Sequence, residues 1–296
     1  MGAVEVISGV EVAFPACAEL GEAPCWDAQA ERLIWVDLMP GLVHRLDPRT
    51  GHDETYDVGQ PVGAAVPTAS GRLALAVSDG FAFLDPERRL VERIADVERD
   101  VAATMFNDGK CGPAGRFWAG TRDVEGRRPI GSLYRLDADL NVTRVVTDVI
   151  LSNGLGWSPD ARTMYYVDSM TYGLDAFDFE PSKGSVSNRR RLLDVPRYWG
   201  LPDGMTVDEE GWIWLAFWGG SSVRRISPTG RVTAIVELPV SQVTSCAFGG
   251  EDLGDLYITS ARGGLSAADL GDQPNAGDLF RLRPGVRGLP NAPFGH

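Results

Sequence analysis

The chain has 296 residues, of which 44% are apolar and 23% are charged, so it can bury a large core as one large all-β domain or as two smaller domains. Its 41 acidic side chains outnumber the 28 basic ones and give a formal net charge of -13. Such a charge repels phosphate backbones and anionic lipid surfaces, so we expect neither nucleic acid nor a membrane as a partner.

The N-terminal stretch MGAVEVISGVEVAFP lacks the basic start and the following apolar run of a secretory signal, and we predict that it forms a strand. No apolar run approaches the roughly 18 residues that a membrane span needs. A cytoplasmic protein is therefore expected. The scattered cysteines form no C-x-x-C pair, which predicts free and mostly buried thiols.

A unit of 41 to 50 residues recurs along the chain, and each copy runs from a polar loop through a turn to an aromatic or aliphatic strand. In chain order these strands are ERLIWVDL (31–38), GRLALAVS (71–78), GRFWAGT (115–121), RTMYYVDS (162–169), GWIWLAFW (211–218) and GDLYITSA (254–261). Each is followed by a second strand-and-turn signature: GLVHRLDPRTG from 41, GFAFLDPERR from 80, GSLYRLDADLN from 131, GLDAFDFEPSKG from 173, SVRRISPTG from 222 and GDLFRLRPG from 277.

Alternating apolar positions separated by Asp-Pro, Ser-Pro and Gly turns favour antiparallel sheet, and no long stretch keeps a helical period. Six such copies predict an all-β, six-bladed β-propeller of four-stranded antiparallel blades that occupies residues 1–296 as one domain. The N-terminal strand has no repeat of its own, so we expect it to complete the last blade and close the ring. A β-sandwich or two unrelated β domains is the alternative, which six copies in register without a linker disfavour.

One position can be followed down the repeat, eight residues before the turn that precedes each strong strand. The residues found there are Glu22, Gly63, Asn107, Asn153, Asp203 and Cys246. Equivalent positions at the entry of innermost strands converge on the channel mouth of a propeller. Four oxygen-bearing side chains in this register therefore predict an oxygen cage for a hard divalent cation.

Two of these positions have a simpler interpretation. Asn153 and Asp203 each precede a glycine, and Asn-Gly and Asp-Gly pairs are strong turn formers on their own. Turn chemistry alone does not require the same offset in four repeats, however. We therefore favour ligation over turn formation at these positions.

A second constellation lies beside the predicted ring. The run MFNDGKCGPAGRFWAGTRDVEG carries Asn107, Asp108, Arg122 and Glu125 near the mouth of the third blade, and Trp199 comes shortly before Asp203 in RYWGLPDG. These residues are candidates for contacts with a substrate. The alternatives are a solvated charged loop and an aromatic side chain that packs the neighbouring loop.

At these residues the sequence resembles the senescence-marker-protein, gluconolactonase and luciferin-regenerating-enzyme family. The matching blocks run along nearly the whole chain: LGEAPCWD, FNDGKCGPAGRFWAGT, SNGLGWSPD, VDSMTYGLDAFDF, LPDGMTVDEEGWIWLAFWGG and SCAFGGEDLGDLYITSARGGL. The resemblance implies that Glu22, Asn153 and Asp203 are the metal ligands. It also implies that Asn107 contacts substrate or metal-bound water and that Glu125 contacts substrate.

One position departs from the family pattern. Members often carry Arg two residues before the Asn of the ND motif, where it grips sugar hydroxyls, whereas this chain has Met105. A fork of donors is thus replaced by a flexible apolar thioether. Two interpretations stay open: Arg122 substitutes from a nearby loop, or the substrate carries fewer hydroxyls than an aldonolactone.

The resemblance and the column together predict a metal-dependent lactonase that hydrolyses a sugar-type or related small lactone to its hydroxy acid. The divalent ion, Ca²⁺, Mg²⁺, Mn²⁺ or Zn²⁺, would polarise the ring ester and activate a water, with Asp203 as the candidate general base. There is no G-x-S-x-G elbow, and the few histidines lie near turn or terminal sequence, at His44, His52 and His296. A serine triad is therefore not expected.

Two other functions fit the same site. One is a hydrolase of another ester class, of the organophosphate type, because one metal-floored propeller can serve several electrophiles. The other is a non-catalytic propeller that binds calcium or a protein partner. The sequence predicts no oligomeric state.

Overall fold

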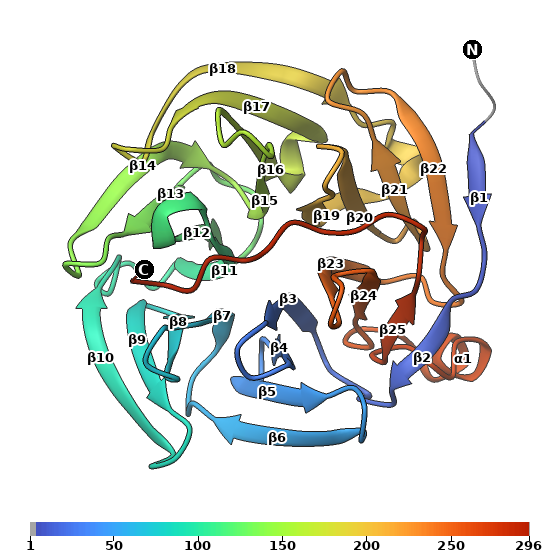
Figure 1. The fold of residues 1–296 in the computed structure, drawn as a ribbon, viewed down its shortest axis with the longest axis horizontal. Coiled ribbons are helices and arrows are strands. Elements are labelled where there is room, and N and C mark those ends of the chain that lie inside the picture. The colour runs from blue at the N-terminus through green and yellow to red at the C-terminus, as the bar shows by residue number, and fades with distance from the viewer. Residues whose placement is uncertain (1–3, 296) are drawn as a thin grey trace.

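Six β-sheets surround a central channel in the computed structural model, which describes residues 4–295 (Figure 1). His296 and the first three residues of the N-terminal stretch lie outside the described residues. The ring confirms the predicted six-bladed propeller, and each strong strand of the repeat is the second strand of its blade. No helix within residues 4–295 is long and apolar enough to cross a membrane.

The first four blades are four-stranded antiparallel sheets. From the channel outward, their strands are β3 (Gly21–Asp27), β4 (Arg32–Asp37), β5 (Leu42–Asp47) and β6 (His52–Asp57) in the first; β7 (Val62–Pro67), β8 (Leu73–Val77), β9 (Gly80–Asp85) and β10 (Leu90–Asp96) in the second; β11 (Thr104–Cys111), β12 (Phe117–Asp123), β13 (Gly131–Leu136) and β14 (Val142–Val149) in the third; β15 (Ser152–Trp157), β16 (Thr163–Asp168), β17 (Gly173–Glu180) and β18 (Ser185–Asp194) in the fourth.

The last two blades take strands from the N-terminus. The fifth contains β19 (Leu201–Val207), β20 (Ile213–Trp218), β21 (Ser222–Ile226), β22 (Val232–Glu237) and β1 (Glu5–Ile7); the sixth contains β23 (Val243–Gly249), β24 (Asp255–Ser260), β25 (Leu279–Leu282) and β2 (Glu11–Phe14). Short helices join some strands: η1 (Pro113–Gly115), η2 (Ser169–Thr171), η3 (Arg197–Trp199) and α1 (Ala267–Asp272).

The N-terminal stretch closes the ring differently from the expectation. Strand β2 pairs antiparallel with β25 and completes the last blade, as predicted. Strand β1, however, pairs parallel with β22 and extends the fifth blade instead. Gly9 lies between the two strands with φ +96, a conformation that favours glycine, so the chain can turn there and serve both blades. The two N-terminal strands thus cover the outer edges of the fifth and sixth blades.

The core lies between the blades rather than in the channel alone. Indole rings on the second strands are almost fully buried, at Trp35, Trp118 and Trp214. Every residue of the innermost strands β3 and β15 is also buried. The outermost strands are mostly exposed, as in β18. Burial falls from the channel outward, so side chains on the innermost strands are held most firmly.

The C-terminal strap, residues 283–295, leaves β25 and crosses one end of the channel (Figure 1). Main-chain hydrogen bonds anchor it on both sides, from Gly288 N to Leu253 O at 2.8 Å and from Phe294 N to Pro67 O at 2.8 Å. Pro67 is the last residue of β7, so the strap lies where the innermost strands end. The column of candidate ligands lies toward the opposite end of the channel, near the start of those strands.

Candidate metal centre

Each innermost strand departs once from regular pairing with its neighbour. The residues at this break are Gly63 in β7, Asn107 in β11, Asn153 in β15, Asp203 in β19 and Thr244 in β23, whereas in β3 the break directly follows Glu22, which still pairs with Val36. A bulge leaves a residue unpaired and re-aims its side chain. The repeated column of the sequence therefore corresponds to a ring of bulges around the channel.

The count of eight residues fails in the sixth blade. It falls on Cys246, which pairs regularly with Ile258, whereas the break in β23 lies at Thr244, two residues earlier. The Thr244 hydroxyl donates to Gly21 O at 2.5 Å, the neighbouring innermost strand. This blade therefore contributes a side chain that joins two strands, and the predicted equivalence of Cys246 with the other five residues is wrong.

The glycines that follow Asn153 and Asp203 are not turn residues. Gly154 lies inside the buried strand β15, and a Cβ there would come within 2.5 Å of Asp203 O. A Cβ at Gly204, inside β19, would meet Ser245 Oγ at 2.1 Å. These glycines allow neighbouring innermost strands to approach closely. The turn interpretation of Asn-Gly and Asp-Gly is wrong, and the strands themselves present both side chains.

The candidate ligands are buried and leave oxygens without partners. Glu22, Asn153 and Asp203 are 3%, 3% and 5% exposed. The Asn153 amide nitrogen donates to Ser169 Oγ at 3.1 Å, but Asn153 Oδ1 and Asp203 Oδ1 are buried with no hydrogen-bond partner. Buried polar atoms in native proteins are nearly always satisfied, by protein, water or an ion. Two orphaned oxygens on adjacent strands fit a site for a cation.

The charges in the cluster of Glu22, Asp108 and Asp203 also fit a site for a cation. Burial raises the pKa of Glu22 well above its usual value, and the negative charges of Asp203 and Asp108 raise it further. Burial and the charge of Asp108 likewise raise the pKa of Asp203. The Asn153 side chain, the Gly204 N–H and the charge of Arg122 act to lower this pKa. Carboxylates held close together in a low-dielectric site repel, and a divalent cation would relieve that repulsion.

No three His, Cys, Asp or Glu side chains converge into a metal cluster within residues 4–295. The predicted ligands are two carboxylates, Glu22 and Asp203, and the neutral amide of Asn153, with the Asp108 carboxylate close by. Oxygen-only donors of this kind suit hard divalent cations better than soft ones. The residues therefore fit an oxygen-liganded ion, and the three-ligand assignment stays a prediction.

Arg122 lies in strand β12, not in a loop as the sequence suggested, and it pairs directly across from Met105. Its Nη2 is 3.6 Å from Met105 Sδ, and its Nε is buried without a partner. Burial lowers the pKa of Arg122, while the charges of Glu22 and Asp203 act against this shift. A guanidinium is thus present beside the cluster, carried by the strand next to that of Met105.

The remaining sequence candidates lie in different surroundings. Asn107 is 5% exposed and donates through Nδ2 to Ser152 O at 2.9 Å, which fixes its amide against the fourth blade. Glu125 lies in the turn after β12 with a side chain 67% exposed, where it pairs with Arg127 at 3.8 Å. The structure does not bring Glu125 into the buried cluster. Its contact with substrate stays a prediction.

Trp199 ends the short helix η3 just before β19. Its ring packs edge-on against Phe217 at 5.9 Å, and the Arg224 guanidinium lies 4.3 Å above it. These contacts account for the aromatic residue as packing of its own loop. Contact with substrate stays a prediction here too.

Two charged side chains of β11 lie close together: Asp108, which the sequence placed beside the predicted ring, and Lys110, to which it gave no role. Asp108 is 3% exposed; burial raises its pKa to about 6, while the charge of Lys110 and the Gly109 N–H act in the other direction. Lys110, two residues on, donates from Nζ to Met205 O. A charged residue on each side of a glycine inside an innermost strand was a usable signal, since these strands carry few charged side chains.

The chain is similar in sequence to proteins of a known family. The profile of the SMP-30/Gluconolactonase/LRE-like region matches residues 20–262. Regucalcin of Gallus gallus is 40% identical over 282 residues, which cover 93% of this chain and 94% of that protein. The chain belongs to the SMP-30/gluconolactonase/LRE-like family. The resemblance noted in the sequence is thereby confirmed.

Two solved structures of this family show the same fold. The calcium-binding protein regucalcin from Agrobacterium tumefaciens superposes with a TM-score of 0.94 at 27% identity and full coverage of both chains. A luciferin-regenerating enzyme superposes with a TM-score of 0.88 at 33% identity, covering 97% of this chain and 99% of that one. Propellers of this family therefore match the present chain from end to end.

Proposed function

We propose that this protein is a divalent-metal-dependent lactonase that opens a sugar-type or related small lactone to its hydroxy acid. The observation that carries the proposal is the pair of buried, unpartnered oxygens, Asn153 Oδ1 and Asp203 Oδ1, on neighbouring innermost strands. Membership of a family named for gluconolactonases supports hydrolysis of a ring ester.

The ion would be held by Glu22, Asn153 and Asp203, and a relative described as calcium-binding supports a metal in this family. Ca²⁺, Mg²⁺ and Mn²⁺ suit the oxygen donors, and Zn²⁺ is the fourth ion to test. When bound, such an ion supplies Lewis acidity, which polarises an ester carbonyl and acidifies water.

The protein's own side chains would supply proton transfer and orientation. Asp203, a proposed ligand whose side chain can also meet the attacking water, would take the proton of that water as general base. The Asn107 amide, fixed by its bond to Ser152 O, would orient the lactone. Arg122, partly buried beside Glu22 and Asp203, would donate to the substrate in place of the guanidinium that Met105 lacks.

A pH-indicator assay tests the proposal. Sugar and non-sugar lactones would be supplied with Ca²⁺, Mg²⁺, Mn²⁺ or Zn²⁺ in turn, and acid release followed against the uncatalysed rate. We expect metal-dependent turnover of at least one lactone. A phosphotriester in the same panel separates the other ester class, since faster turnover of it would replace the lactonase assignment. No turnover of any ester with any ion would leave a metal-binding propeller without catalysis.

A further inference from the structure

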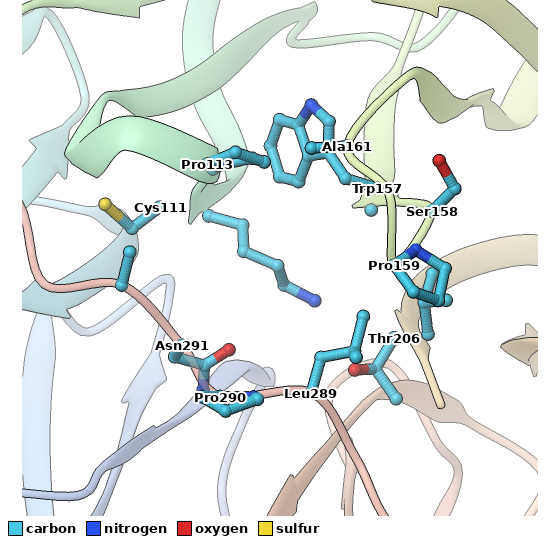
Figure 2. A pocket seen from close by; sticks show the side chains of 15 residues that line it. Cys111, Pro113, Trp157, Ser158, Pro159, Ala161, Thr206, Leu289, Pro290 and Asn291 are labelled. Atoms are coloured by element: carbon cyan, nitrogen blue, oxygen red, sulfur yellow. The ribbon is translucent and has the colours of Figure 1, made fainter. Parts of the chain in front are cut away.

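A cavity of about 340 Å³ lies at the strap end of the channel, away from the candidate metal centre. Its walls come from the ends of the innermost strands β11, β15 and β19 and from strap residues 289–292. Figure 2 shows Pro113 and Trp157 on one side and Leu289 and Pro290 of the strap on the other. This volume lies in the range of roughly 300 to 1,000 Å³ that small-molecule sites occupy.

The cavity carries a single charge of positive sign. Among the residues described as lining it, Lys110 is the one ionisable side chain apart from the thiol of Cys111, and none is acidic. This composition is unexpected in a chain with a formal charge of -13. The charge of Lys110 acts to lower the pKa of nearby Asp108, but Asp108 Oδ1 accepts from the Gly109 N–H at 2.7 Å, and no ion pair joins Asp108 and Lys110 within the described residues.

Lys110 has donors to spare. Its ammonium carries three N–H groups, of which Met205 O accepts one. The sequence uses arginine at nearly every other basic position, and Lys183 is its remaining lysine. A lysine presents a compact point charge on a flexible stem, which suits a single carboxylate group rather than a fixed planar fork. An anion in the cavity would complete its hydrogen bonding.

The rest of the wall favours an apolar body attached to that anion. Trp157 is 6% exposed and packs so closely over Gly112 that a Cβ there would come within 2.7 Å of the indole. Pro113, Pro159 and Leu289 add apolar surface, and Asn291 adds a neutral amide from the strap. Aromatic and proline faces contact flat hydrocarbon well, whereas a polyol would leave hydroxyls unpaired against them.

We propose that this cavity binds a small organic monocarboxylate with an apolar body, whose carboxylate pairs with Lys110 and whose body lies between Trp157 and the strap. The strap forms the roof of the site because its anchors at Gly288 and Phe294 flank the residues that line it. This second site does not depend on the lactonase assignment.

Calorimetry with benzoate as the probe tests the charge requirement. The protein would be titrated with its metal present against benzoate, neutral benzamide and cationic benzylamine, which share one ring. We expect benzoate to bind one site per chain, and benzamide and benzylamine to bind at least tenfold more weakly. Equal binding of benzamide and benzoate would overturn the proposal, and so would an absence of benzoate binding.

Amine labelling locates the bound acid without any mutation. Acetic anhydride would be applied briefly with and without benzoate, and acetylation of Lys110 and Lys183 measured by mass spectrometry in the same sample. We expect benzoate to lower acetylation of Lys110 several-fold and to leave exposed Lys183 unchanged. Unchanged acetylation of Lys110 at saturating benzoate would place the acid elsewhere, for example on the metal, and contradict the proposal.

Two variants complete the test. Lys110→Met should reduce benzoate affinity at least tenfold, whereas Lys183→Met should leave it unchanged. Because Lys110 also donates to Met205 O, its loss could disturb the strands, so Ala292→Trp offers an independent change that fills the cavity from the strap. Wild-type affinity in both Lys110→Met and Ala292→Trp would reject the site.

Discussion

The two ends of the channel are built from the same strands but have opposite chemistry. One end gathers Glu22 and Asp203 around oxygens without partners, whereas the other places Lys110 among neutral and apolar walls. Strand β11 contributes to both, since Asn107 and Lys110 are separated by roughly 10 Å at the usual rise per residue. The position of each side chain along one strand thus decides to which end of the channel it contributes.

The difference shows where a propeller can hold buried polar side chains. At the metal end, the bulges turn short polar side chains toward the channel, and the blade core keeps them from moving away. At the strap end the strands pair regularly, and a covering segment closes the cavity. Under the proposed function, a bound ion would balance the buried polarity at the first end, while the strap covers the cavity at the second end.

The largest expected effect is at Asp203. Replacing Asp203 with Asn keeps the shape but removes both the proposed base and one negative charge, and it should lower kcat/KM for the preferred lactone by at least about 100-fold. The exposed Asp272→Asn, which removes the same charge far from the channel, should leave kcat/KM unchanged. Steady-state assays compare the two variants, and a fully active Asp203→Asn would exclude Asp203 as base.

A smaller but more specific effect is expected at Asn153. Asn153→Ala should weaken metal binding at least about tenfold, because a ligand oxygen is lost, while the lost bond to Ser169 costs about 1 kcal/mol of stability. Ser169→Ala is the matched control, since it removes the same hydrogen bond and keeps the Asn153 oxygen. Metal titration and thermal melting separate the two effects. If Asn153→Ala melts early but binds metal as the wild type does, its role is structural.

The cross-strand pair of Met105 and Arg122 allows a test by exchange. Arg122→Met should lower kcat/KM for hydroxylated lactones by about tenfold and affect lactones without hydroxyls less. The double variant Met105→Arg with Arg122→Met returns a guanidinium from the opposite partner of the same pair and should restore much of the loss. Failure of Arg122→Met to distinguish the two lactone classes would show that Arg122 does not contact the substrate hydroxyls.

The smallest expected effect concerns Asp123, the last residue of β12. Asp123 accepts from Arg128 Nη2 at 2.8 Å and from two backbone N–H groups of the turn that carries Glu125, and these contacts hold the pKa of Asp123 below its usual value. A lowered pKa stabilises the fold above the unfolded value near 3.9, and this contribution is lost as the pH falls further.

Asp123→Asn should therefore be less stable at neutral pH and should lose less stability than the wild type below about pH 4. Urea unfolding at pH 7 and pH 3 measures both values. If the free energy of unfolding falls by the same amount between pH 7 and pH 3 in the variant and in the wild type, Asp123 does not contribute to the acid sensitivity.

The six-bladed ring could be predicted because each repeat contains alternating apolar strands and turn residues, and both depend on local sequence. The sequence also led to Asn153 and Asp203, which the structure places on neighbouring innermost strands because a fixed offset in the repeat is kept in the fold, and their role as ligands stays a prediction. It missed the break at Thr244, because the break lies two residues before the position that the eight-residue offset gives, and no sequence pattern marks this shift. The strap and the role of Lys110 were missed because they depend on a distant segment that crosses the channel.

The interpretation of Asn153 shows the limit most clearly. Asn-Gly predicts a turn from local preference, yet Gly154 serves the close approach of β15 and β19. The role that the resemblance implies for Glu125 stays a prediction, because its exposed position beside Arg127 leaves the side chain free to contact a substrate. Local rules failed where contacts between blades decide the conformation.

Metal depletion tests the central claim most directly. The protein would be treated with a chelator, desalted, and assayed on its preferred lactone before and after one divalent ion is restored. We predict that activity falls to the uncatalysed rate and returns in full with about one ion per chain. Undiminished lactone turnover by the metal-free protein would contradict the account.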